Sequence, residues 1–136
     1  MTDGENKLRE LVLLRGARNN VLSTDSEEEL LEIAVAQLNL DLQRARGILI
    51  ATAESANYEM QSDVDRVTDA MVTAVSAPSR VISQEDFKTV ASYHAGKLKL
   101  SIPIARARIK EIAERLKIYP ERRGLLWSAR WFRTIR

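Results

Sequence analysis

Arginine, lysine and tryptophan side chains gather in the C-terminal region from Arg106 to Arg136, and their chemistry suits an anionic partner. Guanidinium groups pair with phosphates and indole rings stack on unpaired bases. From Leu125 onward, a helical projection places apolar and cationic side chains on opposite sides, which predicts an amphipathic helix. The candidate binding residues are Arg106, Arg108, Lys110, Arg115, Lys117, Arg122, Arg123, Trp127, Arg130, Trp131, Arg133 and Arg136.

Three partners compete for this basic and aromatic region. Nucleic acid, within a larger nucleoprotein assembly or alone, would use the arginines on phosphates. An anionic membrane surface would take the rings at headgroup depth. An acidic protein surface or a second copy of the chain is the third candidate. The alternative without a partner is that Trp127, Trp131 and Phe132 pack on the rest of the chain while the arginines face water.

Two segments have the pattern of a helix-turn-helix. In the first, Ile33 and Ala34 precede a short turn at residues 38–40, and the following helix would offer Asp41, Gln43, Arg44 and Arg46. The acidic run at residues 27–32 weakens this interpretation because it would repel phosphate. The second segment is electrostatically better suited, since its second helix carries Arg106, Arg108 and Lys110.

Residues suited to catalysis are few. The chain has no cysteine, and its one histidine, His94, lies in register with Phe87 and Val90, which predicts a residue at the edge of the core. Three aspartates at positions 63, 65 and 69 lack the glycine and the final glutamate of a calcium loop. No phosphate-binding glycine loop or nucleophile elbow is present. We therefore expect a protein that is not an enzyme and holds no cofactor or metal.

The charge of the chain is divided along its length. Residues 1–96 carry 9 basic and 16 acidic side chains, a net of −7, whereas residues 97–136 carry 12 and 3, a net of +9. The net charge of the whole chain is only +2. Opposite charges in one molecule also favour a homo-oligomer, in which the acidic face of one copy meets the basic face of another.

Length and composition indicate one globular domain. The chain has 136 residues, of which 45% are hydrophobic and 29% charged, with few aromatics. Residues 1–20 lack the apolar run of a signal peptide, and no stretch reaches the roughly 20 apolar residues of a membrane span. We expect a cytoplasmic protein.

Capping signals and apolar periodicity predict an all-α bundle of five to six short helices. We expect a bundle domain over residues 1–120 and a basic aromatic segment over 121–136, either docked on the bundle or used for binding. Gly47 inside the third helix predicts close helix packing. The predicted helix starts are Thr2, Ser26, Asn39, Ser62, Ser83 and Ser101.

An internal duplication is a further prediction. The segment from Leu38 resembles the segment from Leu100, at an offset of 62 in the numbering, while Ser26 aligns with Ser83, at an offset of 57. These offsets differ, so the alignment requires an insertion of about five residues and suggests two pseudo-repeated helical hairpins. The alternative is that any two capped amphipathic helices look alike.

Overall fold

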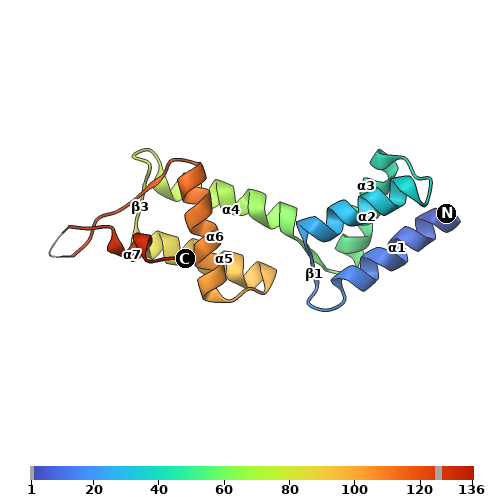
Figure 1. Cartoon of the computed structure of the whole chain (residues 1–136), viewed down its shortest axis with the longest axis horizontal. Coiled ribbons are helices and arrows are strands. Elements are labelled where there is room, and N and C mark those ends of the chain that lie inside the picture. Colours follow the sequence, from blue (N-terminus) through green and yellow to red (C-terminus); the bar gives the residue numbers. More distant parts are fainter. Residues whose placement is uncertain (1, 125–126) are drawn as a thin grey trace. The chain divides into compact units, whose positions relative to one another are not determined.

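The computed structural model describes residues 2–124 and 127–136 and divides the chain into two compact units, Met1–Asp63 and Val64–Arg136. The described residues form seven helices and four two-residue strands (Figure 1). The predominantly helical fold predicted from the sequence is confirmed, with a helix count close to the expected five or six. Residues 121–136 fall within the second unit.

The first unit is built from three helices and one pair of short strands. Strands β1 and β2 pair in parallel, with Val21 opposite Glu59 and Leu22 opposite Met60. In α3, apolar side chains recur at helical spacing and bury Ala45, Ile48 and Leu49. The elements are α1 (Asp3–Gly16), β1 (Val21–Leu22), α2 (Thr24–Ala36), α3 (Leu42–Ser55) and β2 (Glu59–Met60).

The second unit repeats this order and adds a short helix. Its strands also pair in parallel, with Val81 opposite Tyr119 and Ile82 opposite Pro120. Helix α4 begins in the last three residues of the first unit and continues into the second. The elements are α4 (Gln61–Ser76), β3 (Val81–Ile82), α5 (Gln84–Leu98), α6 (Ile102–Arg115), β4 (Tyr119–Pro120) and α7 (Arg130–Arg133).

One constant offset of 60 residues, the separation of Ser23 from Ser83 and of Asp41 from Ser101, relates the two units. The predicted offsets of 57 and 62 were therefore wrong. Both errors come from misplaced caps. Helix α2 is capped by Ser23, whose Oγ accepts a hydrogen bond from the Ser26 backbone N–H, and α3 is capped by Asp41 instead of Asn39. With Ser23 matched to Ser83 and Asp41 to Ser101, no insertion is needed. The duplicated element is a three-helix unit with a strand pair, larger than a hairpin.

Individual hydrogen bonds also recur at this offset. The backbone N–H of Thr24 donates to the side chain of Gln61 (3.0 Å), and the N–H of Gln84 donates to the side chain of Glu121 (2.8 Å). In both units, the side chain of the first residue after the second strand therefore accepts a hydrogen bond from the first backbone N–H of the middle helix. The repeat is defined by these contacts as well as by element order.

Three left-handed backbone positions also recur at this offset. The first unit places asparagine at each, with φ between 54° and 60°. Asparagine tolerates this conformation better than other residues with a Cβ. The second unit places a cation at each instead. The pairs are Asn20 and Arg80, Asn39 and Lys99, and Asn57 and Lys117.

Each unit has its own hydrophobic cluster. The first includes Leu30 and Leu49 and the second includes Val90 and Ile109, which occupy the same repeat positions. The close packing predicted around Gly47 was wrong, because a Cβ built there meets no atom within 4 Å.

The C-terminal segment differs from its prediction. An amphipathic helix from Leu125 onward is not formed, since α7 covers only Arg130–Arg133 and Arg123 pairs with Ser128 in an antiparallel bridge. Left-handed φ angles at Gly124 (85°) and Trp127 (47°) explain why no helix passes through this stretch. The predicted positions Leu125 and Leu126 lie outside the described residues. Within the described ranges, no helix is both long and apolar enough to cross a bilayer.

Candidate anion-binding surface of the second unit

The two units carry opposite charge although they share a fold. The first unit has 6 basic and 12 acidic side chains, a net of −6, and the second has 15 and 7, a net of +8. The charge division at the unit boundary, −6 against +8, is therefore nearly as large as the division of −7 against +9 at residue 96.

Five of the ten predicted cations have side chains that contact or pack into their own unit. Arg115 contacts both carboxylate oxygens of Asp69 at 2.8 Å, which joins α6 to α4. The ammonium of Lys110 donates to the Ile135 carbonyl (2.9 Å) and lies 5.4 Å from the centre of the Phe132 ring. Arg123 donates to the side chain of Gln84 (2.9 Å), while Arg106 and Arg108 are half-buried.

The other five predicted cations are exposed. Their side chains have neither a hydrogen bond nor an ion pair to another part of the described chain. They are Lys117, Arg122, Arg130, Arg133 and Arg136. These residues, which we call the free cations, remain available for a partner. Lys117 also occupies one of the left-handed positions at which the first unit has asparagine.

The aromatic residues of the C-terminal segment have different roles. Phe132 is buried, and the rings of Phe87, Trp131 and Phe132 meet edge to face, with centroids 5.4 to 5.9 Å apart. The indole N–H of Trp131 donates to the Glu121 carbonyl at 2.8 Å. Trp131 and Phe132 therefore pack within their own unit, as the alternative interpretation expected for these two residues.

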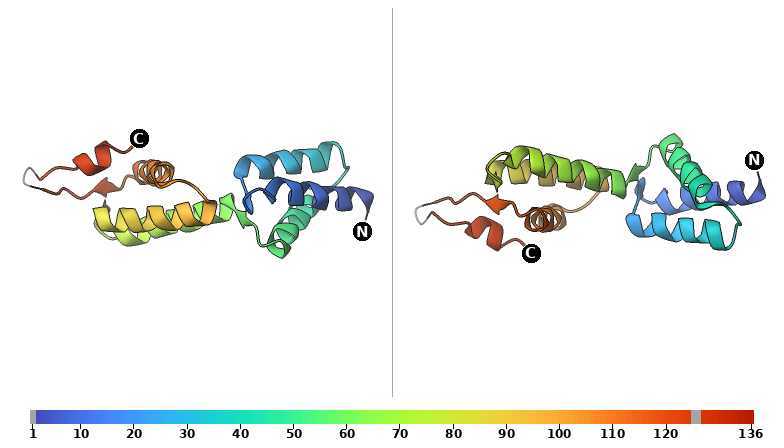
Figure 2. Two further views of the ribbon diagram at one scale, coloured as in Figure 1. Left: turned by 90° about the horizontal axis from the view of Figure 1, so that it is seen from below. Right: turned by 90° about the horizontal axis from the view of Figure 1, so that it is seen from above.

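Trp127 does not join this cluster, and 69% of its surface is exposed. It precedes Ser128, which closes a loop with two backbone hydrogen bonds to Arg123, of 2.7 and 3.0 Å. Figure 2 shows the chain before and after this loop running side by side away from the helices of the second unit. The predicted set therefore separates into an anchored part and an exposed part, and Trp127 belongs to the exposed part.

The helix-turn-helix interpretation finds little support in the side chains. In the first unit, Asp41 caps α3 and Arg44 donates to Glu5 at 3.1 Å. That guanidinium lowers the pKa of the Glu5 carboxyl. Gln43 and Arg46 of α3 remain exposed, with Arg46 the one cation among the predicted groove residues of this helix that is not paired with Glu5. In the second unit, Arg106, Arg108 and Lys110 of α6 are half-buried, which limits their access to a DNA groove.

His94 was predicted at the edge of the core, but it is fully buried and contacts Thr68. The Thr68 hydroxyl donates to the Val64 carbonyl (2.8 Å), so its contact with His94 Nδ1 at 3.0 Å requires the ring N–H as donor. The ring is fully buried and its Nε2 has no hydrogen-bond partner in the described chain. Burial lowers the pKa of His94, the Asp65 charge raises it and the Arg108 charge lowers it. The residues of the first unit equivalent to Thr68 and His94 are Leu8 and Ala34.

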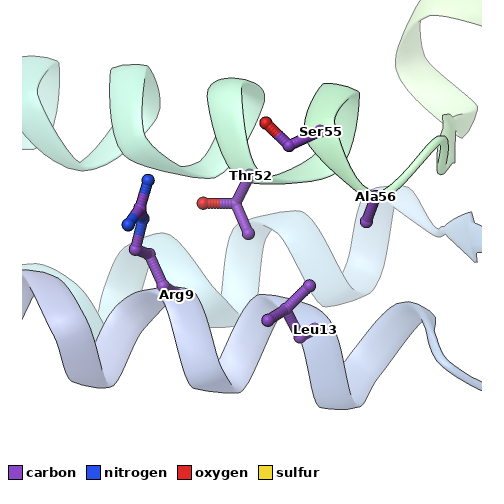
Figure 3. Close-up of a pocket in the computed structure, with 5 residues that line it drawn as sticks. All are labelled: Arg9, Leu13, Thr52, Ser55 and Ala56. Carbon is purple, nitrogen blue, oxygen red and sulfur yellow. The ribbon is translucent and has the colours of Figure 1, made fainter.

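A shallow pocket of about 230 Å³ lies between α1 and α3 of the first unit (Figure 3). Arg9 is its single charged residue, and Leu13, Thr52, Ser55 and Ala56 complete it. The Thr52 hydroxyl already donates to the Ile48 carbonyl at 2.7 Å. In the second unit, Asp69 and Arg115 occupy the positions of Arg9 and Ser55 and form an ion pair. The pocket has no group of residues that would catalyse a reaction.

No group of three or more potential metal ligands occurs in the described residues. Comparisons of the chain with protein-family models, curated proteins and solved structures find no match. Sequence analysis did not reveal that lysine and arginine occupy the left-handed backbone positions of the second unit. A correct alignment of the two units would have placed Lys117 opposite Asn57, but the left-handed backbone itself leaves no signal in the sequence.

Proposed function

We propose that the protein is a non-enzymatic binding module whose second unit engages an anionic partner, with nucleic acid preferred. One observation carries this proposal. The first unit builds the same order of helices and strands with a net charge of −6, so the fold does not require the +8 of the second unit. A charge that the fold does not need is available for binding.

The free cations supply the contacts. They include Arg122 and Arg130, which flank the Arg123–Ser128 bridge in the sequence, and Lys117 at a left-handed position. A bulky cation at such a position costs conformational energy that asparagine avoids. Electrostatic attraction to phosphates would offset that cost in the bound state.

Binding to nucleic acid should weaken with salt, because counterion release then contributes less to the affinity. With five free cations, the slope of log affinity against log salt on duplex should not exceed about 4.5, or 0.9 per neutralised phosphate. The double variant Arg130→Gln with Arg133→Gln should lower this slope by about 1.8. Fluorescence anisotropy at several salt concentrations measures both values.

The matched control replaces two exposed arginines of the acidic unit, Arg18→Gln with Arg46→Gln, and should leave the slope unchanged. No retention of duplex or single strands at about 50 mM salt would contradict the proposal.

A second candidate function is a homo-oligomer formed between unlike units. The observation that favours it is that the two units of one chain carry opposite net charges, −6 and +8. Light scattering would then give a mass above 15.4 kDa that falls as salt is raised, since salt screens charges beyond about 10 Å at 0.1 M. A monomer at every salt and protein concentration removes this candidate.

A further inference from the structure

The exposed tryptophan of the second unit has a conformation that a packing role does not explain. Trp127 exposes 69% of its surface, while Trp131, one helical turn later in the sequence, is half-buried and hydrogen-bonded to the Glu121 carbonyl. Burying an indole contributes more than burying almost any other side chain. A ring left in solvent beside an anchored one is available for an external contact.

The backbone at Trp127 is held in an unusual conformation. Trp127 has a φ of 47°, a value that bulky residues seldom adopt. Its N–H donates to the Gly124 carbonyl at 3.0 Å, and the two hydrogen bonds between Arg123 and Ser128 close the loop. Unusual backbone conformations persist where surrounding contacts determine them, and they cluster at binding sites.

Cations lie on both sides of the loop. The bridge between Arg123 and Ser128 and the bond from Trp131 to Glu121 keep the two chain segments side by side. Arg122 lies on one segment and Arg130 on the other, and both are exposed without an internal partner in the described chain. An aromatic ring flanked by guanidinium groups can bind a base and its neighbouring phosphates together.

This arrangement suits an unpaired strand better than a duplex. Reading a duplex groove generally requires an element with exposed polar or cationic side chains, and the cations of α6 are half-buried or paired within the fold. Stacking on a tryptophan instead requires a base whose face is free, which only unpaired nucleic acid offers.

We infer that Trp127 is a stacking platform for an unpaired base, flanked by Arg122 and Arg130, and that the second unit binds single-stranded nucleic acid. This inference rests on the proposed function, because it specifies which nucleic acid that surface takes. It assigns to Trp127 the preference for single strands and to the free cations the salt-dependent part of the affinity.

The test compares a labelled dT oligonucleotide of about 16 nucleotides with a duplex of the same length, both titrated with the full chain. Wild-type protein should bind the single strand more tightly, with quenching of tryptophan fluorescence. Trp127→Ala should raise the dissociation constant for the single strand by about 5- to 150-fold, the range of one lost base stack. Its affinity for duplex should change less than twofold.

Two further variants separate stacking from other effects. Trp127→Phe keeps a ring and should retain most of the single-strand affinity. Tyr119→Ala removes another aromatic side chain of the same unit, 64% exposed on β4, and should leave that affinity unchanged.

The outcomes for inference and function differ. Equal affinity of wild type for both probes, with no effect of Trp127→Ala, overturns the inference and leaves the proposed function standing. Absence of binding to either probe at about 50 mM salt overturns both, and binding to anionic vesicles alone would assign Trp127 to a membrane surface instead.

Discussion

Lys117 places a cation at a backbone position where the first unit has asparagine. Its backbone is left-handed with a φ of 57°, and the equivalent residue of the first unit is Asn57 with a φ of 59°. Its side chain is exposed and has no internal partner in the described chain. The backbone at this position is thus the same in both repeats, while the side chain changes from neutral to cationic.

We therefore expect Lys117→Asn to stabilise the second unit by up to about 1 kcal/mol, because asparagine tolerates the left-handed region. Lys117→Gln removes the same charge without that benefit. Both variants should lower the salt slope of nucleic-acid binding by about 1. Urea unfolding measures the stability, and equal stability of the two variants would refute the backbone explanation.

The buried His94 predicts a pH dependence of stability. Its pKa is lowered in the folded unit, so the unfolded chain binds the proton more tightly and protonation favours unfolding. The contribution of the neutral ring is therefore present above the unfolded pKa of about 6.5 and is lost as pH falls below it. Asp65 opposes this loss and Arg108 adds to it.

Between about pH 7.5 and 5.5, the free energy of unfolding should decrease by at most about 1.4 kcal/mol per pH unit, which is the limit for binding one proton. Tryptophan fluorescence in urea reports it, because both tryptophans lie in the second unit. Replacing the pair by that of the first unit, Thr68→Leu with His94→Ala, should reduce the decrease. An equal decrease in the variant would assign it to other groups.

At the scale of elements, most helices could be predicted and the strands could not. Apolar periodicity and caps such as Ser83 identify the helices, although nearby serines led to Ser26 in place of Ser23. Strands of two residues leave no alternating pattern, so β1 to β4 carry no sequence signal. Likewise, Arg115 could not be excluded from the binding set, because its partner Asp69 is 46 residues away in sequence.

Two helical glycines allow a matched test of packing. A Cβ at Gly16 would collide with the ring of Tyr58, whose hydroxyl is held by the Leu13 carbonyl at 2.7 Å. We expect Gly16→Ala to destabilise the first unit by about 1 to 3 kcal/mol. At Gly47, with no atom within 4 Å of the added Cβ, Gly47→Ala should stabilise it by about 0.5 to 1 kcal/mol.

Circular dichroism during urea unfolding measures both glycine variants. The second unit has Ser76 and Ile118 at the positions of Gly16 and Tyr58, so Gly16→Ser with Tyr58→Ile should recover stability relative to Gly16→Ser alone. Equal effects of alanine at Gly16 and Gly47 would contradict the packing described for α1.

At the scale of the whole molecule, the two hydrophobic clusters share no described residue. We expect damage to one cluster to stay within its unit. Leu49→Ala and Ile109→Ala remove equivalent buried side chains, at a cost of about 2 to 5 kcal/mol each. Hydrogen exchange should show lost protection within residues 1–63 for the first variant and within 64–136 for the second. Loss spread evenly over both ranges in either variant would contradict separate units.

The charge division is the property of the whole molecule that the sequence showed most directly, because counting needs no knowledge of contacts. The function of individual cations was less predictable. Arg115 and Arg130 look alike in sequence, yet one pairs with Asp69 and the other is exposed without an internal partner in the described chain. That distinction depends on tertiary placement, which composition does not encode.

The hydrogen bonds from Thr24 to Gln61 and from Gln84 to Glu121 make the junction between repeats a natural splice point. A copy of the segment from Gln61 to Pro120, inserted after Pro120, would place a glutamine where Glu121 now stands and would keep Glu121 at its own end. The side chains of Gln61 and Glu121 already accept the equivalent hydrogen bond in the two units. We therefore expect that a repeat can be added as a segment of this length, because its first residue supplies the acceptor that the preceding repeat requires.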